Sequence, residues 1–265
     1  MLKAIIFDMD GTLADTEEIH RQAFNAAFAE FQIPCEWSPE EYRQLLAISG
    51  GKERLRAYLL EHAVVALPRA EVLKLAALMH KRKSEIYREK LVQGHVGLRP
   101  GVARLIHEAH AQGVRLAIAT SSSRDNVEAL LQNTLGADAP ALFDCIVTCE
   151  IVTDKKPSPS VYQFVLARLG LGADHCIAIE DTRNGNLAAL GAGLNTIITT
   201  HAFTLDDDFS GAALVLDQLG EPEQPFRVLA GNALGRRYVD LDLLRAMQAD
   251  EDPQEWEPAR VIAAE

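Results

Sequence analysis

The sequence predicts an α/β protein in which a doubly wound parallel sheet of Rossmann-like arrangement carries a second, smaller, all-helical domain. Three observations support this prediction. Short apolar runs alternate with amphipathic segments of helical length. Several of these runs are apolar throughout, as strands are in a sheet that is covered on both faces. One stretch, residues 16–92, contains helical patterns and no convincing strand.

The core strands are predicted where short apolar runs lie between segments of helical or turn character. They are Ala4–Phe7, Val114–Ala119, Cys145–Thr148, Cys176–Ile179, Asn195–Ile198 and Ala213–Leu216. Helical stretches separate all but the outermost of these runs. Strands and helices in alternation favour parallel neighbours joined by crossover helices, and hence a doubly wound sheet.

Proline and glycine mark the ends of the expected core helices. "PGVARLIHEAHAQG" opens with Pro100 and stops at Gly113. "SPSVYQFVLARLG" has Ser158 as its expected N-cap, Pro159 in its first turn and Gly170 after its end. "RNGNLAALGAG" fits a third helix. These segments supply the crossovers that a parallel sheet requires.

The helical insert also contains recognisable helix starts. "SPEEYRQLL" begins with a capping box formed by Ser38 and Glu41, with Pro39 at the first helical position. "RAEVLKLAALMHKRKSEIYREKL" predicts one long helix with basic residues crowded towards its end. We therefore expect a core domain of residues 1–15 and 93–249, a helical domain of residues 16–92, and a flexible acidic tail of residues 250–265.

Composition restricts the class of protein. The 265 residues are 48% hydrophobic and 24% charged, which is ordinary for a globular chain with a large core. A net charge of −12 argues against nucleic acid or an anionic membrane as a partner. The chain has no apolar run long enough for a transmembrane helix and no signal-peptide pattern at its start. We expect a cytoplasmic protein that does not bind membranes.

The cysteines do not form a metal-binding motif. Cys35, Cys145, Cys149 and Cys176 are scattered through apolar surroundings without CxxC spacing. Cys145 and Cys149 are the nearest pair, but "FDCIVTCE" has no histidine beside it and is typical of a strand. We interpret all four as structural thiols, which agrees with a reducing compartment.

The segment "IIFDMDGTLADTEEIH" places Asp8 and Asp10 directly after an apolar strand. A hairpin turn does not fit, because a helical pattern rather than a strand follows. A calcium-binding EF-hand loop requires glycine at its sixth position, whereas Gly11 is fourth when Asp8 is first. Two solvated loop acids remain the plain alternative. Burial of an unpaired carboxylate is costly, so a cation is the other explanation for this pair.

Three further groups follow later strands at the same predicted edge of the sheet. Thr120 follows "LAIA", Lys156 precedes a proline in "TDKKPSPSVY", and an acidic pair, Glu180 and Asp181, follows "CIAI". Open α/β sheets bind their ligands at the carboxyl ends of the strands. Carboxylates, a hydroxyl and a lysine at one edge suit phosphoryl transfer, in which positioning and neutralisation of oxygen charge supply most of the catalysis.

"DMDGT", the threonine after the second strand, "KKPSP" and "IEDTRNG" together resemble the four signature segments of the haloacid dehalogenase superfamily. The insert after the first segment is similar to the helical cap of one subgroup, which includes β-phosphoglucomutase. "DTEEIHRQAF", "EEYRQLL", "SGGKERL", "KKPSPSVY" and "GEPEQPFRVLAGNALGRRYVDL" resemble the CbbY-type phosphatases over about residues 1 to 245. Those enzymes remove the 1-phosphate of xylulose 1,5-bisphosphate.

The resemblance implies a role for each core residue. Asp8 would attack phosphorus to form an aspartyl-phosphate, and Asp10 would act as general acid and base. Mg²⁺ would be the cofactor, held by Asp8, the main-chain carbonyl of Asp10, Asp181 and Glu180.

The resemblance also assigns the phosphate-binding residues. The transferred phosphoryl group would be bound by Thr120, by Ser121 after it and by Lys156. The neighbouring Lys155 is interpreted as a solvated charge.

The resemblance implies that the helical cap binds the part of the substrate that lies away from the transferred phosphoryl group. The positions implied by the resemblance are Glu17, His20, Tyr42, Lys52, Arg54 and Lys83. Glu17 and His20 share one face of a helix that starts at Thr16. "SGGKERL" joins a Gly50–Gly51 turn to a new helix, whose free backbone N–H groups suit an anion. Without the resemblance, the plain alternatives are a surface or core-edge histidine, a packing tyrosine and a solvated basic run.

The expected activity is Mg²⁺-dependent hydrolysis of a sugar phosphate, a small-molecule bisphosphate such as xylulose 1,5-bisphosphate, by a monomeric enzyme. A sugar-phosphate mutase would use the same two aspartates. A phosphoglycolate-type phosphatase would need fewer cap cations. A non-catalytic binding protein would have no physical reason to keep this density of charge at one edge.

Overall fold

The computed structural model describes residues 1–62, 64–93 and 96–249. In this part of the chain the sheet has seven strands in the order β3-β2-β1-β4-β5-β6-β7. The strands are β1 (Ala4–Phe7), β2 (Arg115–Ala119), β3 (Cys145–Val147), β4 (Cys176–Glu180), β5 (Asn195–Thr199), β6 (Leu214–Leu216) and β7 (Val228–Gly231). The pairs from β3 through β6 are parallel, which confirms the six predicted strands and the fold class.

The edge strand β7 was not predicted. It pairs with β6 in antiparallel orientation, and Val228 and Leu229 are exposed. A strand that is open on one edge and exposed to solvent lacks the continuous apolar run that identifies buried strands.

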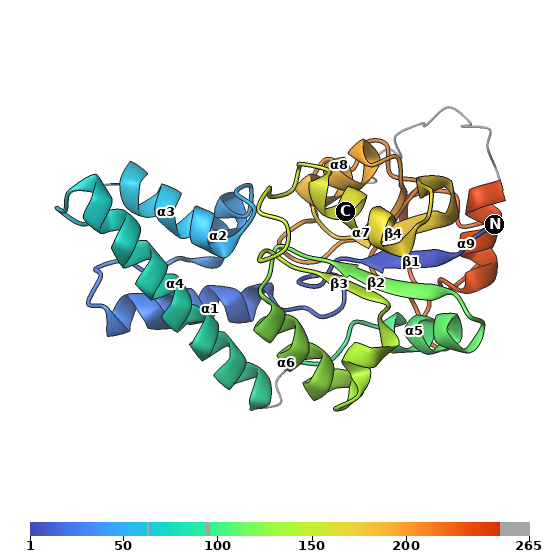
Figure 1. The fold of residues 1–265 in the computed structure, drawn as a ribbon, viewed down its shortest axis with the longest axis horizontal. Coiled ribbons are helices and arrows are strands. Elements are labelled where there is room, and N and C mark those ends of the chain that lie inside the picture. Colours follow the sequence, from blue (N-terminus) through green and yellow to red (C-terminus); the bar gives the residue numbers. More distant parts are fainter. Residues whose placement is uncertain (63, 94–95, 250–265) are drawn as a thin grey trace, which may run out of the picture.

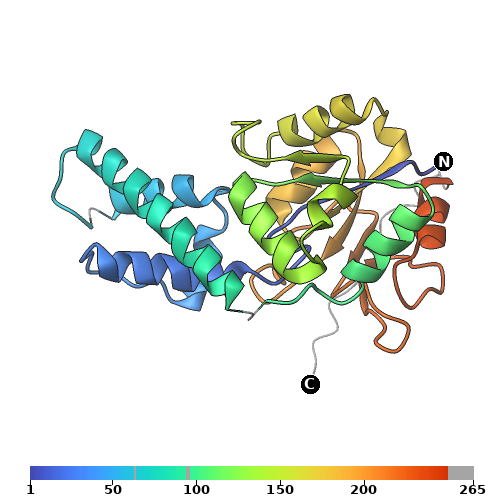
Figure 2. The same ribbon diagram turned by 60° about the horizontal axis from the view of Figure 1, so that its bottom comes forward.

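The two faces of the sheet are covered by different helices (Figures 1 and 2). The core helices are α5 (Val102–Ala111), α6 (Arg124–Leu135), α7 (Ser160–Leu169), α8 (Arg183–Gly191) and α9 (Leu241–Ala249), with short 3₁₀ turns η1 (Ala139–Leu142) and η2 (Ala173–His175). Ile5 and Phe7 of β1 join the buried cluster formed with α5, α6 and α9. Ala4 and Ile6 join the cluster formed with α7 and α8. This alternation is why β1 reads as apolar throughout.

The expected start of α7 needs a correction. The helix begins at Ser160, with Pro159 at the N-cap position, so Ser158 is not the N-cap. The Ser158 hydroxyl instead bonds the Ser160 hydroxyl at 2.8 Å. The predicted end is confirmed, because Gly170 follows the helix in a left-handed conformation with φ of 63°.

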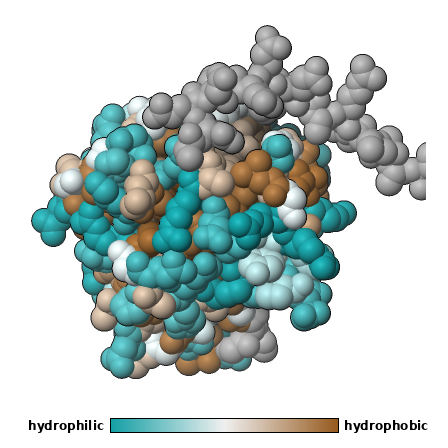
Figure 3. Space-filling view, turned by 90° about the vertical axis from the view of Figure 1, so that its right-hand side faces the viewer, coloured by the Kyte–Doolittle hydropathy of each residue, from teal (hydrophilic) through white to brown (hydrophobic). Residues whose placement is uncertain are grey.

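The helical insert forms α1 (Glu17–Glu30), α2 (Pro39–Leu45), α3 (Gly51–Glu61) and α4 (Arg69–Val92), which lie at one end of the sheet (Figure 1). The N-cap half of the capping box of α2 is observed, since the Ser38 hydroxyl accepts a hydrogen bond of 3.1 Å from the Glu41 backbone. The insert has a buried cluster of its own, with Phe24, Phe28, Trp37, Tyr42 and Tyr58 among its members. Figure 3 shows the opposite end of the molecule, where hydrophilic residues surround smaller hydrophobic areas.

The separate aromatic cluster supports our proposal that residues 16–92 are a domain distinct from residues 1–15 and 93–249. The tail predicted to be flexible, residues 250–265, lies outside the described residues. The four cysteines are free; three are half-buried, and Cys176 is buried. Among the described helices, none combines the length and the apolar character that a membrane span requires.

Candidate active site

Neighbouring parallel strands bring the carboxylates together. Phe7 of β1 is paired with Ile179 of β4, so Asp8 and Glu180 follow side by side, and the Asp8 backbone donates a 2.9 Å hydrogen bond to the Ile179 carbonyl. Asp8, Glu180 and Asp181 are all buried, and each offers an oxygen within 4.8 Å of the others'. The predicted convergence at the sheet edge is therefore observed for these residues.

Lys156 provides the positive charge beside this cluster. Its Nζ donates to Asp8 Oδ1 at 2.6 Å, to Glu180 Oε1 at 2.5 Å and to the Ala119 carbonyl at 3.0 Å. Burial opposes the charge on the Lys156 ammonium, but Asp8 and Glu180 outweigh it and raise the pKa of Lys156. The lysine therefore stays charged across the physiological range.

One ammonium does not balance three buried carboxylates. Burial raises the pKa of Asp8 well above its usual range, with Lys156 opposing that rise and the two neighbouring carboxylates adding to it. Burial also raises the pKa of Asp181 to about 6, against the lowering effect of His201. A cluster of close oxygen ligands with excess negative charge fits a hard divalent cation such as Mg²⁺.

The Asp10 side chain turns away from this cluster and towards α1. Its Oδ1 accepts hydrogen bonds from Thr16 Oγ1 at 2.7 Å and pairs with His20 Nε2 at 2.9 Å. Burial acts to raise the pKa of Asp10, but the His20 charge and the hydrogen bonds from His20 and Thr16 outweigh it and lower the pKa to about 2. Any metal contact by Asp10 would therefore come from its main chain.

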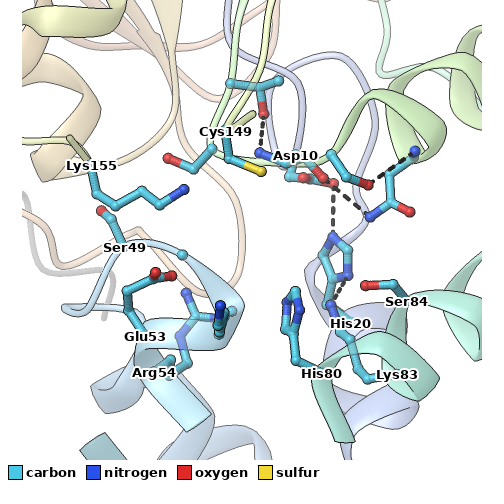
Figure 4. A pocket seen from close by; sticks show the side chains of 18 of the residues that line it. Asp10, His20, Ser49, Glu53, Arg54, His80, Lys83, Ser84, Cys149 and Lys155 are labelled. Carbon is cyan, nitrogen blue, oxygen red and sulfur yellow. Dashed lines mark hydrogen bonds and ion pairs between the residues drawn. The ribbon is translucent and has the colours of Figure 1, made fainter. Parts of the chain in front are cut away.

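His20 connects Asp10 to Lys83 on α4 (Figure 4). Lys83 Nζ lies 2.7 Å from His20 Nδ1, and the His20 ring stacks on Tyr87 with centroids 4.0 Å apart. Burial lowers the pKa of Lys83 to about 7, against the attraction of Asp10 and Glu17. The chain Lys83–His20–Asp10 thus carries a proton donor at one end and an ionised carboxylate at the other.

A cavity of about 590 Å³ lies between the sheet edge and the helical insert. Asp8, Asp10, Thr120, Ser121 and Lys156 line it from the core side. Thr120 directly follows β2, and its hydroxyl accepts a 3.0 Å hydrogen bond from the Ser122 backbone. The core residues predicted to hold a phosphoryl group therefore share one cavity with the carboxylates.

Comparison with known proteins shows which family has this arrangement of residues. The family described as haloacid dehalogenase-like hydrolase matches residues 5–199. The chain belongs to this family. It is a phosphoric monoester hydrolase of the haloacid dehalogenase type, similar to CbbY.

The relatives match over most of their length. The plasmid-encoded protein CbbY of Cupriavidus necator is 45% identical over 92% of this chain and 96% of that protein. Protein CbbY of Rhodobacter capsulatus is 47% identical over 80% of this chain and 91% of that protein. The crystal structure of CbbY from Rhodobacter sphaeroides in complex with phosphate has a TM-score of 0.75 and 43% identity, covering 82% of this chain and 95% of that one.

A second structure of Rhodobacter sphaeroides CbbY, a mutant in complex with xylulose-1,5-bisphosphate, is 42% identical to this chain with a TM-score of 0.75. It covers 82% of this chain and 95% of that one. A small-molecule substrate for this haloacid dehalogenase hydrolase is therefore supported.

On the cap side of this hydrolase, Glu17, His20, Lys52, Arg54 and Lys83 line the cavity. Arg54 and Lys83 are buried, whereas Lys52 is exposed to solvent at the cavity wall. The glycine turn before α3 is observed as expected, with Gly50 at φ of 88°.

Tyr42 does not line the cavity, which corrects the expectation that it faces the substrate. It is fully buried behind the wall. Its hydroxyl donates to Glu17 Oε2 at 2.9 Å and accepts from Arg54 at 2.9 Å. Packing among α1, α2 and α3 turns the ring inward, so Tyr42 holds two cavity residues in place.

The structure adds cavity residues that the sequence did not assign to the site. Lys155, which we interpreted as a solvated charge, is half-buried and lines the cavity (Figure 4). His80 also lines the cavity, and burial followed by the Lys83 charge lowers the pKa of His80 to about 3. His80 lies three residues before Lys83 on α4, and this helical spacing was the one signal that could have located it.

Hydrogen bonds connect the helical insert to the core of the hydrolase. Asn184 donates to the Ala47 carbonyl at 2.9 Å, and Arg88 donates to Asn126 at 3.1 Å. The contact from Asn184 begins at α8, directly after the acidic pair. The cavity is therefore bounded by groups from both parts of the chain.

Proposed function

We propose that this hydrolase is a Mg²⁺-dependent phosphatase that acts on a sugar bisphosphate, and that xylulose 1,5-bisphosphate is the substrate its site fits best. One observation carries the proposal: a cavity with Asp8 and Lys156 at its core wall has further cations, Lys52 and Arg54, at the wall formed by the cap. The likeness to a CbbY that binds xylulose-1,5-bisphosphate supports the same substrate.

In the first step, an Asp8 carboxylate oxygen forms a bond to phosphorus as the bond from phosphorus to the sugar oxygen breaks. Lys156 opposes the rise in the pKa of Asp8 and so favours its ionised form, and it lies where it would neutralise the phosphoryl oxygens, beside Thr120 and Ser121. In the second step, water attacks the phosphorus of the aspartyl-phosphate and releases inorganic phosphate, which regenerates Asp8.

Asp10 handles the protons. With its pKa lowered to about 2 it is ionised, the form that takes a proton from the attacking water. The hydrogen bonds from Thr16 and His20 sustain this low pKa. Protonation of the leaving oxygen in the first step requires the acid form of Asp10, so Asp10 has to give up the His20 contact that lowers its pKa and carry its proton to the sugar oxygen. The proton that Asp10 takes from the attacking water in the second step replaces the one it donated.

Mg²⁺ would be held by Asp8, Asp181 and the Asp10 carbonyl, with Glu180 beside them, and when bound it supplies positive charge to the phosphoryl oxygens. On the cap side, Arg54 is fixed by the Leu45 carbonyl at 3.0 Å and by Tyr42, and so presents a preorganised cation to the second phosphate. Glu17 and His20 would contact the sugar.

The experiment is a panel of sugar mono- and bisphosphates, including xylulose 1,5-bisphosphate, with and without Mg²⁺, followed by phosphorus NMR. We expect free phosphate, formed fastest from the bisphosphate. Phosphate that moves to another carbon without release would indicate a mutase. Fastest release from phosphoglycolate would indicate the smaller substrate.

A monomer that binds neither nucleic acid nor membrane remains our proposal, and the net charge of −12 supports it.

A further inference from the structure

A histidine outside the four signature segments contacts the proposed metal ligand Asp181. His201 lies two residues beyond the end of β5, and only 2% of its side chain is exposed. Its Nε2 lies 2.9 Å from Asp181 Oδ2. The mechanism above assigns this buried imidazole no role.

A backbone hydrogen bond fixes the tautomer of the His201 ring. The Phe203 backbone N–H donates to His201 Nδ1 at 3.3 Å, so Nδ1 accepts and Nε2 carries the hydrogen that is donated to Asp181. Asp15 Oδ1 is 4.0 Å from Nδ1, beyond hydrogen-bond distance. The tautomer therefore follows from a backbone contact.

The pair is also enclosed on the side of the catalytic loop. Gly11 has φ of 85°, and a Cβ at this position would lie 2.7 Å from His201 Nε2 and overlap the Asp181 carboxylate. Thr12 Oγ1 donates to Asp181 Oδ1 at 3.1 Å. Both oxygens of Asp181 thus have a fixed partner, and the loop after Asp10 covers them.

The loop that carries the ring is held by the cap. Arg43 of α2 donates to the Ala202 carbonyl at 2.7 Å, and the Phe203 ring packs edge-on against Tyr42 with centroids 5.7 Å apart. Three consecutive residues, 201–203, therefore contact the acidic cluster at one end and the cap at the other.

We propose that His201 is a positioning residue that fixes the orientation of Asp181 and so sets the affinity of the site for Mg²⁺. The proposal rests on the Mg²⁺ site of the proposed function. Partners that orient a metal ligand change metal affinity by about 10–100-fold when they are removed.

The test measures Mg²⁺ binding by calorimetry in the absence of substrate, which is independent of catalysis. His201→Phe keeps a ring but removes the donor, and we expect its Kd for Mg²⁺ to rise at least about 10-fold. His201→Gln keeps an N–H donor and should stay within about 3-fold of the wild type. At saturating Mg²⁺, the substrate KM of both variants should match that of the wild type. His107→Gln, at an exposed position on α5, is the matched control.

A folded His201→Phe with wild-type Mg²⁺ affinity would overturn the proposal. If that variant does not fold, His201→Gln decides: a Mg²⁺ affinity that falls more than about 10-fold would mean that the donated hydrogen bond is not what matters. Failure of the proposed function would give a different result: the wild type would bind Mg²⁺ with an affinity that depends on His201, but it would release no phosphate. A wild type that releases phosphate without binding Mg²⁺ would overturn the metal site and the role of His201 together.

Discussion

Replacement of Lys156 by methionine is expected to destabilise the protein strongly in the absence of metal. Lys156 is 6% exposed and donates to two buried carboxylates and one carbonyl. Methionine keeps most of the volume but leaves Asp8 and Glu180 adjacent without their ammonium. Removal of one partner from a buried ion pair costs about 3–5 kcal/mol, because an uncompensated buried charge remains.

Lys155→Met is the matched control, since the same substitution is made one residue earlier at a half-buried cavity position. Substitutions of this kind change stability by about 0.5 kcal/mol or less. The assay is urea unfolding at one pH with EDTA, followed by circular dichroism. The slope of free energy against urea must be the same for all three proteins, so that the midpoints report stability.

Mg²⁺ should make the Lys156→Met protein more stable than the same variant in EDTA, because the cation neutralises the carboxylates that the lysine no longer balances. A ligand that binds only the folded state stabilises it by about 2.7 kcal/mol at 100 times its Kd. A Lys156→Met loss below about 1 kcal/mol, or one equal to that of Lys155→Met, would refute the reasoning that this ammonium balances the acidic cluster.

Three other substitutions test separate parts of the site. Asp8→Asn should keep the circular dichroism spectrum and lose phosphate release by at least about 1000-fold; substantial remaining turnover would contradict its role as nucleophile. Arg54→Ala should raise KM for a bisphosphate at least about 10-fold more than KM for a small chromogenic monophosphate, because only the former places a phosphate at the cap; equal losses would argue against phosphate recognition by the cap. The pKa of His80 is lowered to about 3 in the folded protein. Below about pH 6.5 the unfolded chain therefore binds a proton at His80 that the folded protein does not bind, and the free energy of unfolding decreases as the pH is lowered. At pH 5 this loss of stability amounts to about 2 kcal/mol. In thermal unfolding, the melting temperature of the wild type should therefore decrease more between pH 7 and pH 5 than that of His80→Gln.

The core half of the site was predictable because its residues follow strand ends. Parallel strands fix where Asp8, Thr120 and Glu180 lie once the strands are known, and apolar runs identify the strands. The same rule would have reached His201 after β5, but no signature segment includes that position. Strand β7 escaped because exposed edge strands have no such run.

The cap half depends on packing that has no simple period. Tyr42 follows a clear capping box, yet whether its ring faced the cavity or the interior was set by Phe24, Trp37 and Phe203, which come from distant segments. Lys155 and Lys156 are adjacent in an irregular loop, so no helical or strand alternation assigned one to the carboxylates and the other to the cavity wall.

The distribution of charge supports our proposal that both halves are needed to bind a bisphosphate. The core wall holds three buried carboxylates and Lys156, and by itself it would repel a second phosphate. The cap adds Lys52, Arg54 and Lys83 across the cavity. A phosphoryl group can lie near Asp8 only if a cation neutralises the buried carboxylates of the core wall. The second phosphate can be bound only if the basic residues of the cap lie close to it. Tight binding of the remote group can then hold the cap against the sheet edge, which places the scissile phosphate beside the nucleophile and makes recognition of the sugar a condition of the chemistry.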